Sequence, residues 1–503
     1  MHMRTALAGA TAISLLFSLP ALAGDNFSNV VQDGSNNSGS VTQGGSHDEA
    51  GGNPLVPGSA ITQSGSNQTF TILQSGSYNQ VGTGGAGFDQ MGARNRANIT
   101  QSSDNNIVGE VQQNRTGLNA SNPANTLNIL QQGGNANRVS TVIQTRSGGL
   151  LTGTSGNDAD ITQTGTANLV TELSQSGRAN DATISQKGDG NKVNFLTQDG
   201  VGNDAVIDVV GNLNTVDIDQ ESVVSGNGAD VHILTGDSNG IRIDQSAFGA
   251  GNDAKVAITD GDSNHVDIFQ ASLVRGNDAL VKIEDGEKNN VNIDQDGANA
   301  ATVEIVGDRN AANLRQIGTN GADLLVRGGD NSILGNQSTG ILGSNALTVT
   351  INTGDNNGVS VNQTVGLVAS GKNIADLTIN GDNNLLDIDQ TKSGFGGSNS
   401  LTVSIWGDNN NSGPTFLGSA AASVGLTPGH LVQSGSGNSL MLTVGTTLQS
   451  DSNQFAMSQL GDGNKITGTI NGDFNQAAIL QTGNNNLTSF TQTGNFNVIG
   501  VSQ

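Results

Sequence analysis

Residues 216–220 read Val-Asp-Ile-Asp-Gln, and closely similar segments end at Gln245, Gln270 and Gln295. These glutamines follow one another every 25 residues, and each stands six residues after an asparagine. A fixed period this short is typical of stacked supersecondary units and not of one globular core. The repeat therefore decides the fold.

The alternation within each segment predicts a β-strand with one buried face. Asn239, Ile241, Ile243 and Gln245 share one parity, and side chains of one parity point to the same side of a strand. The residues between them are mostly polar, and helix periodicity fits none of the segments. The buried side of each strand thus reads Asn, apolar, apolar, Gln.

Tight corners separate the strands. Most units begin with a glycine three residues before the asparagine, as in Gly236-Asp237-Ser238-Asn239, and these residue types accept left-handed backbone angles. Each period also contains a strand without glutamine, such as residues 252–258. We therefore predict an all-β, amyloid-like (cross-β) fold: a parallel, in-register β-solenoid with strand-corner-strand rungs of about 22–25 residues.

Stacking in register places identical amides over one another, where they hydrogen-bond along the stack and to the corner backbone. On the outer face the same register places Arg242 between Asp217 and Asp267. Such exposed pairs contribute about 0–1 kcal/mol each. The predicted structural ladder comprises Asn180, Gln186, Asn214, Gln220, Asn239, Gln245, Asn264, Gln270, Asn289, Gln295, Asn475, Gln481, Asn486, Gln492, Asn497 and Gln503.

Composition supports a repetitive, exported protein. Hydrophobic residues make up 34% and aromatic residues 3% of the chain, which is low for large globular cores, yet the phased apolar residues argue against disorder. Cysteine is absent, so no disulfide framework is predicted. The formal net charge of −24 disfavours nucleic acid as a partner.

The chain divides by pattern into five segments. Residues 1–23 are expected to be a signal peptide, with Arg4, an apolar run and the small-residue motif Ala21-Leu22-Ala23. The expected division is a signal peptide at 1–23, irregular repeats with loop insertions at 24–150, a regular β-solenoid at 151–410, a loop insertion at 411–437 and a C-terminal solenoid with an 11-residue strand period at 438–503.

Residues 175–186 and 481–492 carry the frame Gln-x-Gly-x-x-Asn, which closes on a second glutamine. This frame resembles the curlin repeat of bacterial curli subunits. The resemblance implies export with a periplasmic chaperone through a curli-type outer-membrane pore of a Gram-negative-type bacterium. It also implies self-assembly, or assembly with a related curlin subunit, into extracellular cell-surface (pilus-like) amyloid fibres of the biofilm matrix.

Two non-enzymatic functions follow from the pattern. In the first, the chain is expected to be a subunit or nucleator of such fibres, because the repeat continues to Gln503 and an exposed strand edge is a template for addition. The opposing interpretation is that this last rung frays and adds nothing. Alternatively it is a monomeric acidic adhesin that binds surfaces or host matrix. Corners such as Asp260-Gly261-Asp262 could then bind calcium, although they also fit ordinary corner chemistry.

An enzyme is not predicted. The aspartates repeat with the rungs, which marks them as surface residues, whereas a catalytic pair should interrupt the repeat. The pattern contains no phosphate loop or nucleophile arrangement, so we predict no catalytic residue, no metal site and no cofactor. The histidines are scattered: His2, His47, His232, His265 and His430.

Overall fold

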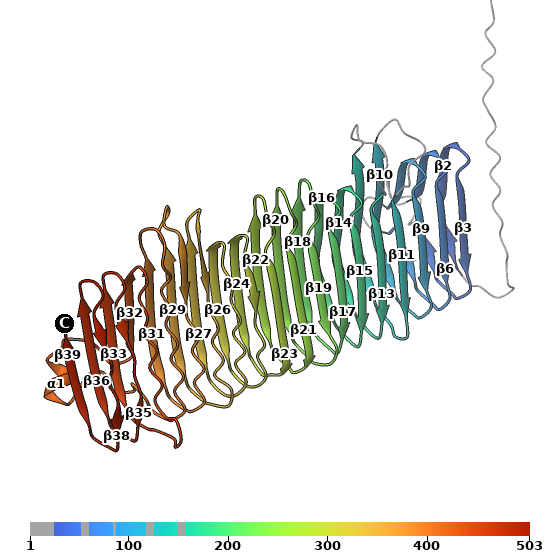
Figure 1. Cartoon of the computed structure of the whole chain (residues 1–503). Helices are drawn as coiled ribbons and strands as arrows, with labels where there is room; N and C mark the ends of the chain where they lie inside the picture. Colours follow the sequence, from blue (N-terminus) through green and yellow to red (C-terminus); the bar gives the residue numbers. More distant parts are fainter. Residues whose placement is uncertain (1–24, 52–59, 84–86, 117–124, 148–155) are drawn as a thin grey trace, which may run out of the picture. The chain divides into compact units, whose positions relative to one another are not determined.

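The computed structural model describes residues 25–51, 60–83, 87–116, 125–147 and 156–503. The predicted signal peptide, residues 1–23, lies outside these ranges. Contacts divide the chain into unit 1, Met1–Gly226, and unit 2, Asn227–Gln503. Each unit is a β-solenoid of parallel strands, so the predicted fold class is confirmed (Figure 1).

Unit 1 has two walls of parallel strands, which we call wall A and wall B. Wall A comprises β1 (Phe27–Ser28), β2 (Val30–Ser35), β4 (Glu49–Ala50), β5 (Ile61–Ser66), β7 (Gln80–Val81), β8 (Phe88–Ala93), β10 (Ile107–Thr116), β12 (Arg138–Ser147), β14 (Leu169–Arg178), β16 (Lys192–Val201) and β18 (Thr215–Ser222). Wall B comprises β3 (Ser38–Gln43), β6 (Thr69–Gln74), β9 (Arg96–Gln101), β11 (Thr126–Gln132), β13 (Asp158–Thr164), β15 (Asp181–Lys187) and β17 (Asp204–Val210).

In the walls of unit 1, identical side chains stack on one another. In β13 and β15, Ile161 lies opposite Ile184 and Gln163 lies opposite Gln186. All four side chains are buried, while the residues between them face outward. Burying one such isoleucine stabilises the fold by about 2 kcal/mol, so the interior column is a main source of stability.

Four strands of wall A, β10, β12, β14 and β16, contain one extra residue. In β14 the interior residues Val170 and Leu173 are three positions apart, and both are fully buried. Gln175 consequently stands seven residues after Asn168, not six. The extra residue disappears at β18, where the register with β16 shifts between Val193 and Leu196.

Wall A of unit 2 continues through eleven strands. These are β20 (Gly240–Ala247), β22 (His265–Ser272), β24 (Asn290–Gly297), β26 (Ala311–Gly318), β27 (Ser332–Thr339), β29 (Gly358–Val365), β31 (Leu385–Lys392), β32 (His430–Gly435), β33 (Gln454–Leu460), β36 (Gln476–Thr482) and β39 (Val498–Ser502). The 25-residue rung is present where Arg242 lies opposite Asp267, as predicted. The rung length changes elsewhere, because insertions are accommodated at the corners.

Wall B of unit 2 is less regular. Its first strands are β19 (Gly228–Ile233), β21 (Asp253–Asp260), β23 (Asp278–Asp285) and β25 (Ala300–Thr302). Beyond them the described chain has only short pairs: β28 (Gly343–Ala346) with β30 (Gly371–Ile374), β34 (Lys465–Ile466) with β37 (Leu487–Thr488), and β35 (Ile470–Asn471) with β38 (Gln492–Thr493). Leu325, Ile351 and Ile405 adopt φ angles of 55°, 55° and 100°, which no β-strand contains.

The predicted loop at 411–437 is partly wrong, because it contains β32. Leu431 and Gln433 alternate inward as in other rungs, but the glycines and prolines around them obscured the pattern. The preceding residues form an insertion with the short helix α1 (Ser419–Ala422), which packs on the outer face of the last strands. Its apolar contacts comprise Phe416, Ala421, Val424, Leu426, Ala456 and Ala478.

Candidate functional site

The predicted glutamines form continuous amide ladders in the interior of the solenoid. Gln270 accepts a hydrogen bond from Gln245 Nε2 at 2.8 Å and donates one to Gln295 Oε1 at 2.9 Å. Its second N–H donates to the carbonyl of Asp253 in the facing wall, at 3.0 Å. Each glutamine therefore joins its neighbouring rungs and also closes its own coil.

The asparagines form a second kind of ladder at the corners. The backbone N–H and the side-chain Nδ2 of Asn264 both donate to Asn239 Oδ1, each at 2.9 Å. Asn289 Nδ2 donates in turn to Asn264 Oδ1 at 3.0 Å. The asparagine amide thus satisfies backbone groups that a tight corner would otherwise leave unpaired.

The two ladders point in opposite directions along the stack. In the glutamine ladders within each unit, the earlier rung donates through Nε2 and the later rung accepts; Gln144 donates to Gln175, and Gln245 to Gln270. The corner asparagine ladder runs the other way, since Asn168 Nδ2 donates to Asn137 Oδ1. A stack of rungs therefore presents different hydrogen-bonding groups in its two directions.

Most predicted ladder residues are buried with amide partners on neighbouring rungs. Asn486 and Asn497 are half-buried, and Gln503 is exposed, although its Oε1 accepts from Gln481 Nε2 at 3.3 Å. Gln186 ends its ladder, because Val209 occupies the position opposite it in β17. Gln492 lies opposite Ile470 and so does not join a glutamine ladder.

The spacing of six residues does not predict the ladder of the bulged strands. Asn168, Gln175, Asn191 and Gln198 are buried ladder members, but their Asn-to-Gln spacing is seven residues. A search that allowed one extra residue between the two apolar positions would have found them. The spacing of six describes only strands without the bulge.

Wall B differs between the units. In unit 1 it has its own ladder, in which Gln131 donates to Gln163 at 2.8 Å and Gln163 to Gln186 at 2.9 Å. In unit 2 the same interior position is occupied by isoleucine, as in Ile258 and Ile283, which lie opposite each other in β21 and β23. Wall B of unit 2 therefore has an apolar interior column in place of a glutamine ladder, while amide bonds between its rungs remain at the corners, where Asn277 Nδ2 donates to Asn252 Oδ1 at 3.0 Å.

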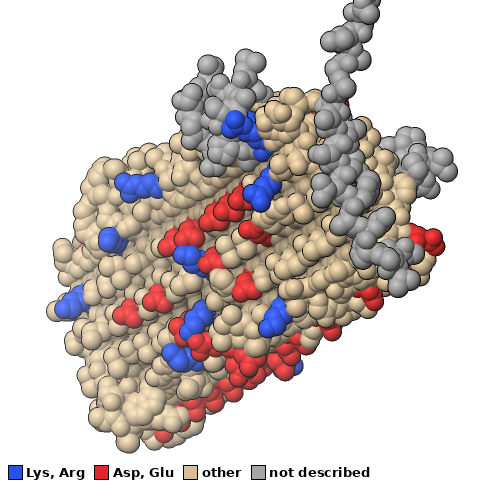
Figure 2. Space-filling model, turned by 90° about the vertical axis from the view of Figure 1, so that its right-hand side faces the viewer, with Lys and Arg blue, Asp and Glu red and all other residues tan. Residues whose placement is uncertain are grey.

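The acidic corners are tied to the backbone. Asp262 Oδ1 accepts the N–H of Asp237 at 2.7 Å, and Asp382 Oδ1 accepts the N–H of Asp355 at 2.8 Å. One oxygen of each carboxylate therefore serves the corner, in agreement with the corner interpretation of the Gly-Asp-x-Asn pattern. Figure 2 shows acidic side chains gathered along one margin of the visible face, and basic side chains scattered among acidic ones elsewhere.

Several carboxyl groups in unit 1 have raised pKa values. Burial raises the pKa of Asp181, and the nearby carboxylates of Asp204, which lies opposite it, and Asp160 raise it further. Asp48 is fully buried and occupies an asparagine-ladder position, where its Oδ1 accepts the Asn79 N–H at 3.0 Å. Burial raises the pKa of Asp48 even though the hydrogen bonds from Asn79 oppose this.

The corners that follow the wall A strands of unit 2 carry exposed apolar side chains. Their exposed fractions range from 59% at Phe248 to 82% at Ile341. Such exposed apolar surface is unusual for a soluble monomer and is typical of contact with another molecule. The row comprises Phe248, Leu273, Val274, Ile341, Leu342, Leu367, Val368 and Phe395.

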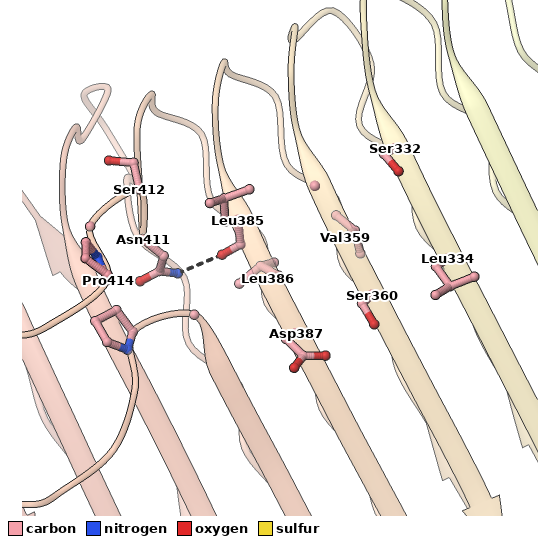
Figure 3. A pocket seen from close by; sticks show the side chains of 14 residues that line it. Ser332, Leu334, Val359, Ser360, Leu385, Leu386, Asp387, Asn411, Ser412 and Pro414 are labelled. Atoms are coloured by element: carbon pink, nitrogen blue, oxygen red, sulfur yellow. Dashed lines mark hydrogen bonds between the residues drawn. The ribbon is translucent and has the colours of Figure 1, made fainter.

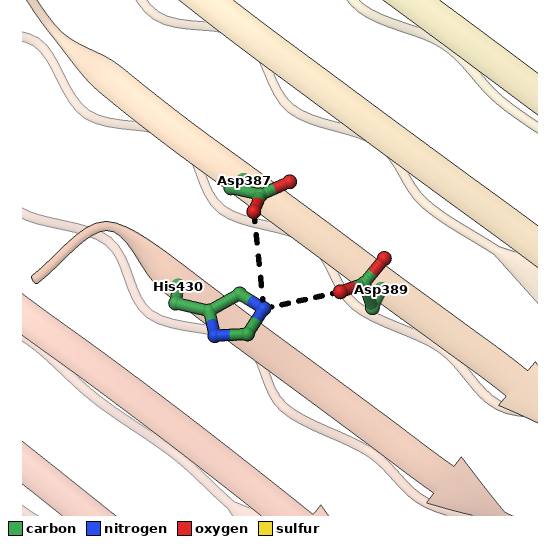
Figure 4. Close-up of side chains that lie close together, drawn as sticks. All are labelled: Asp387, Asp389 and His430. Atoms are coloured by element: carbon green, nitrogen blue, oxygen red, sulfur yellow. Dashed lines mark hydrogen bonds and ion pairs between the residues drawn. The ribbon is translucent and has the colours of Figure 1, made fainter. Parts of the chain in front are cut away.

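The described histidines lie on outer surfaces. His232 and His265 each approach a single carboxylate, of Asp230 and Asp267. His47 stacks on Tyr78, with ring centroids 4.7 Å apart. His430 is different, because it lies between Asp387 and Asp389 on the outer face of wall A (Figure 4).

A groove lies beside the insertion in unit 2 (Figure 3). It has a volume of about 540 Å³, and strands β27, β29 and β31 form its floor. Leu334, Leu385 and Pro414 contribute apolar surface, while Asp387 and Ser360 contribute polar groups. The groove is the kind of concave surface that could accept a small ligand.

Comparison with known proteins agrees with the repeat. The curlin associated repeat family matches residues 195–221, which include β16 from Phe195 onward and most of β18. The chain carries a curlin repeat. No curated protein matches the sequence. Among the described residues, no helix is long and apolar enough to cross a membrane.

The curlin repeat coincides with the ladder geometry. Gln198 and Gln220 lie inside the matched range, and Gln198 Nε2 donates to Gln220 Oε1 at 2.9 Å. Asn214, also in the range, donates to Asn191 Oδ1 at 3.1 Å through Nδ2. The matched range therefore contains residues that join one rung to the next.

Proposed function

We propose that this chain is a structural subunit or nucleator of extracellular, curli-like amyloid fibres that support adhesion and a biofilm matrix. The observation that carries the proposal is the uniform direction of the ladders. Because each rung offers glutamine donors one way and asparagine donors the other, the groups on one side of a rung are complementary to those on its opposite side. A second copy, or a related curlin subunit, could extend such a stack head to tail, with the glutamines of wall A continuing their ladder.

The surface of unit 2 supports a role at the cell exterior. The exposed apolar row offers contacts to neighbouring fibres or surfaces, and the acidic corners keep unassembled copies apart. The curlin repeat further suggests secretion through a curli-type pore with a periplasmic chaperone. No enzymatic step is part of this proposal.

Seeded growth tests the fibre proposal. We expect the purified chain to form fibres that bind thioflavin and shorten the lag phase of a fresh solution. Gln131→Ala should slow elongation, because it removes the acceptor of one Gln101 N–H and the donor to Gln163 Oε1. Gln132→Ala is the matched control, since Gln132 is the next residue of β11 and faces outward.

The two possible failures have different meanings. A folded, β-rich chain that never elongates would contradict the fibre proposal and favour a monomeric acidic adhesin. In that case a calcium titration would ask whether the acidic corners bind the ion through their remaining oxygens. Equal elongation rates for Gln131→Ala and Gln132→Ala would contradict the ladder mechanism alone.

A further inference from the structure

One imidazole and two carboxylates meet on the outer face of wall A in unit 2 (Figure 4). His430 Nε2 lies 3.0 Å from Asp389 Oδ2 and 3.9 Å from Asp387 Oδ2. One ligand atom from each of the three residues lies within 4.8 Å of the other two. The side chains are partly exposed, between 39% and 56%, so the cluster is open to solvent.

The β-ladder fixes this cluster in place. Asp387 and Asp389 are two positions apart on β31 and so project from the same face, and His430 lies directly opposite Asp387 on β32. The interior bond from Gln390 to Gln433, at 2.7 Å, sets the register of these two strands. The insertion contributes as well, because the N–H of Asp387 donates to Gly429 O at 2.9 Å.

A neighbouring amide orients one of the carboxylates. Asn362 Nδ2 donates to Asp389 Oδ1 at 3.0 Å, while the other oxygen, Oδ2, is the one near His430. Outer hydrogen bonds of this kind commonly orient carboxylate ligands in metal sites. The hydrogen bond from Asn362 thus orients Asp389 so that its Oδ2 points at the imidazole of His430.

The ligand set suits a divalent transition metal. Zinc binds imidazole nitrogen and carboxylate oxygen at about 2.0–2.2 Å in tetrahedral geometry, which separates the ligand atoms by about 3.3 Å. The distances of 3.0 and 3.9 Å bracket that separation. We propose that Asp387, Asp389 and His430 bind one Zn²⁺ ion and leave its fourth position to water.

The other histidine pairs of unit 2 do not offer this combination. His265 and His232 each lie near one carboxylate only, at 3.1 and 2.6 Å. The cluster also interrupts the repeat, since His430 follows the insertion and stands 43 residues after Asp387 in the same outer column. Asp387 also lines the groove of Figure 3, so a ligand bound there would lie near the ion.

Zinc titration of the full chain tests the proposal. Isothermal titration of metal-free protein with ZnCl₂ should show one site per chain above the weak background of the acidic surface. His430→Asn should weaken this site at least about tenfold, because imidazole is the strongest ligand of the set. Asp389→Asn should weaken it as well, and circular dichroism should show that both variants remain folded.

The matched control is His265→Asn, which removes a similarly exposed histidine beside a single carboxylate. We expect it to leave the site unchanged. Superimposable titrations of the unmodified chain and His430→Asn would overturn the proposal. Equal weakening by His430→Asn and His265→Asn would overturn it too, because binding would then be a general property of exposed histidines.

Discussion

The two units differ in how wall B is held together. In unit 1 a glutamine ladder runs through wall B as well as wall A, and all its described strands pair in register. In unit 2 isoleucine replaces those glutamines, and regular pairing of wall B ends at β25. Wall A of unit 2 keeps its ladder, and its strands continue to β39.

This difference shows what an amide ladder adds to apolar packing. Apolar contacts bury area without fixing which residue lies over which, whereas each amide bond fixes one donor over one acceptor. The ladder in unit 1 also ends without leaving its last donor unpaired, because Gln186 Nε2 donates to Leu169 O at 3.3 Å. A change from glutamine to an apolar residue is therefore tolerated where the final amide finds a backbone partner.

The largest expected effect comes from placing a single glutamine in the apolar wall. Ile258→Gln in unit 2 should lower the free energy of unfolding by about 3 kcal/mol, because its buried amide has no ladder partner and apolar contacts are lost. Urea unfolding with hydrogen exchange of the unit 2 strands measures this.

A triple variant sharpens the same test. When Ile233, Ile258 and Ile283 are all replaced by glutamine, the three amides can pair with each other. The free energy of unfolding should therefore fall by clearly less than three times the loss caused by Ile258→Gln. If the triple variant loses three times the free energy of the single variant, the new amides do not form a ladder, and the prediction is wrong.

The reverse change in unit 1 should have a somewhat smaller effect. Gln163→Ile removes the acceptor of one Gln131 N–H and the donor to Gln186 Oε1 but adds apolar burial, so we expect the free energy of unfolding to fall by about 2 kcal/mol. Gln132→Ile, on the outer side of β11, is the control and should change stability by about 0.5 kcal/mol or less. If both variants unfold at the same urea concentration, the ladder is not the source of wall B's stability.

Asp48→Asn should stabilise unit 1 by about 1 kcal/mol at neutral pH, because it restores the amide that the ladder position otherwise holds. Burial raises the pKa of Asp48, so the fold favours its neutral form. The neutral Asp48 carboxyl therefore stabilises the unmodified chain fully below pH 3.8, the ordinary pKa. This stabilisation is lost as the pH rises through the raised pKa of the folded state.

The pH dependence provides the measurement for this prediction. The stability difference between Asp48→Asn and the unmodified chain should be small at about pH 3 and should grow toward about pH 7. Asp33→Asn, at an exposed position of β2, is the control. A difference that shrinks as the pH rises would contradict the assignment.

The smallest effect is expected on the outer face. Arg242 lies opposite Asp267 in register, but its guanidinium approaches Asp244 at 3.7 Å and lies 5.0 Å from the centre of the Phe269 ring. These groups are exposed, so Arg242→Ala should change the free energy of unfolding by less than about 1 kcal/mol. A larger loss in urea unfolding would show that outer charges, and not only the ladders, hold the rungs together.

The repeat unit of this protein can be read from its amino-acid sequence. The parity of Asn239, Ile241, Ile243 and Gln245 identified the buried face, and the Gly-Asp-x-Asn segments identified the corners. Both rules depend on neighbours along the chain, which a sequence displays directly. The seven-residue spacing from Asn168 to Gln175 escaped the pattern, because a bulge alters the alternation on which the rule rests.

The side-chain contacts between rungs, in contrast, depend on the folded solenoid. The opposed directions of the glutamine and asparagine amides depend on side-chain rotation, which no spacing encodes. The packing of α1 on Ala456 and Ala478 required the insertion to fold back over later strands. His430 likewise meets Asp387 because the register of β32 is set by Gln433 in the interior, whatever the length of the intervening chain. Contacts between distant residues follow from stacking, and stacking is a property of the folded solenoid.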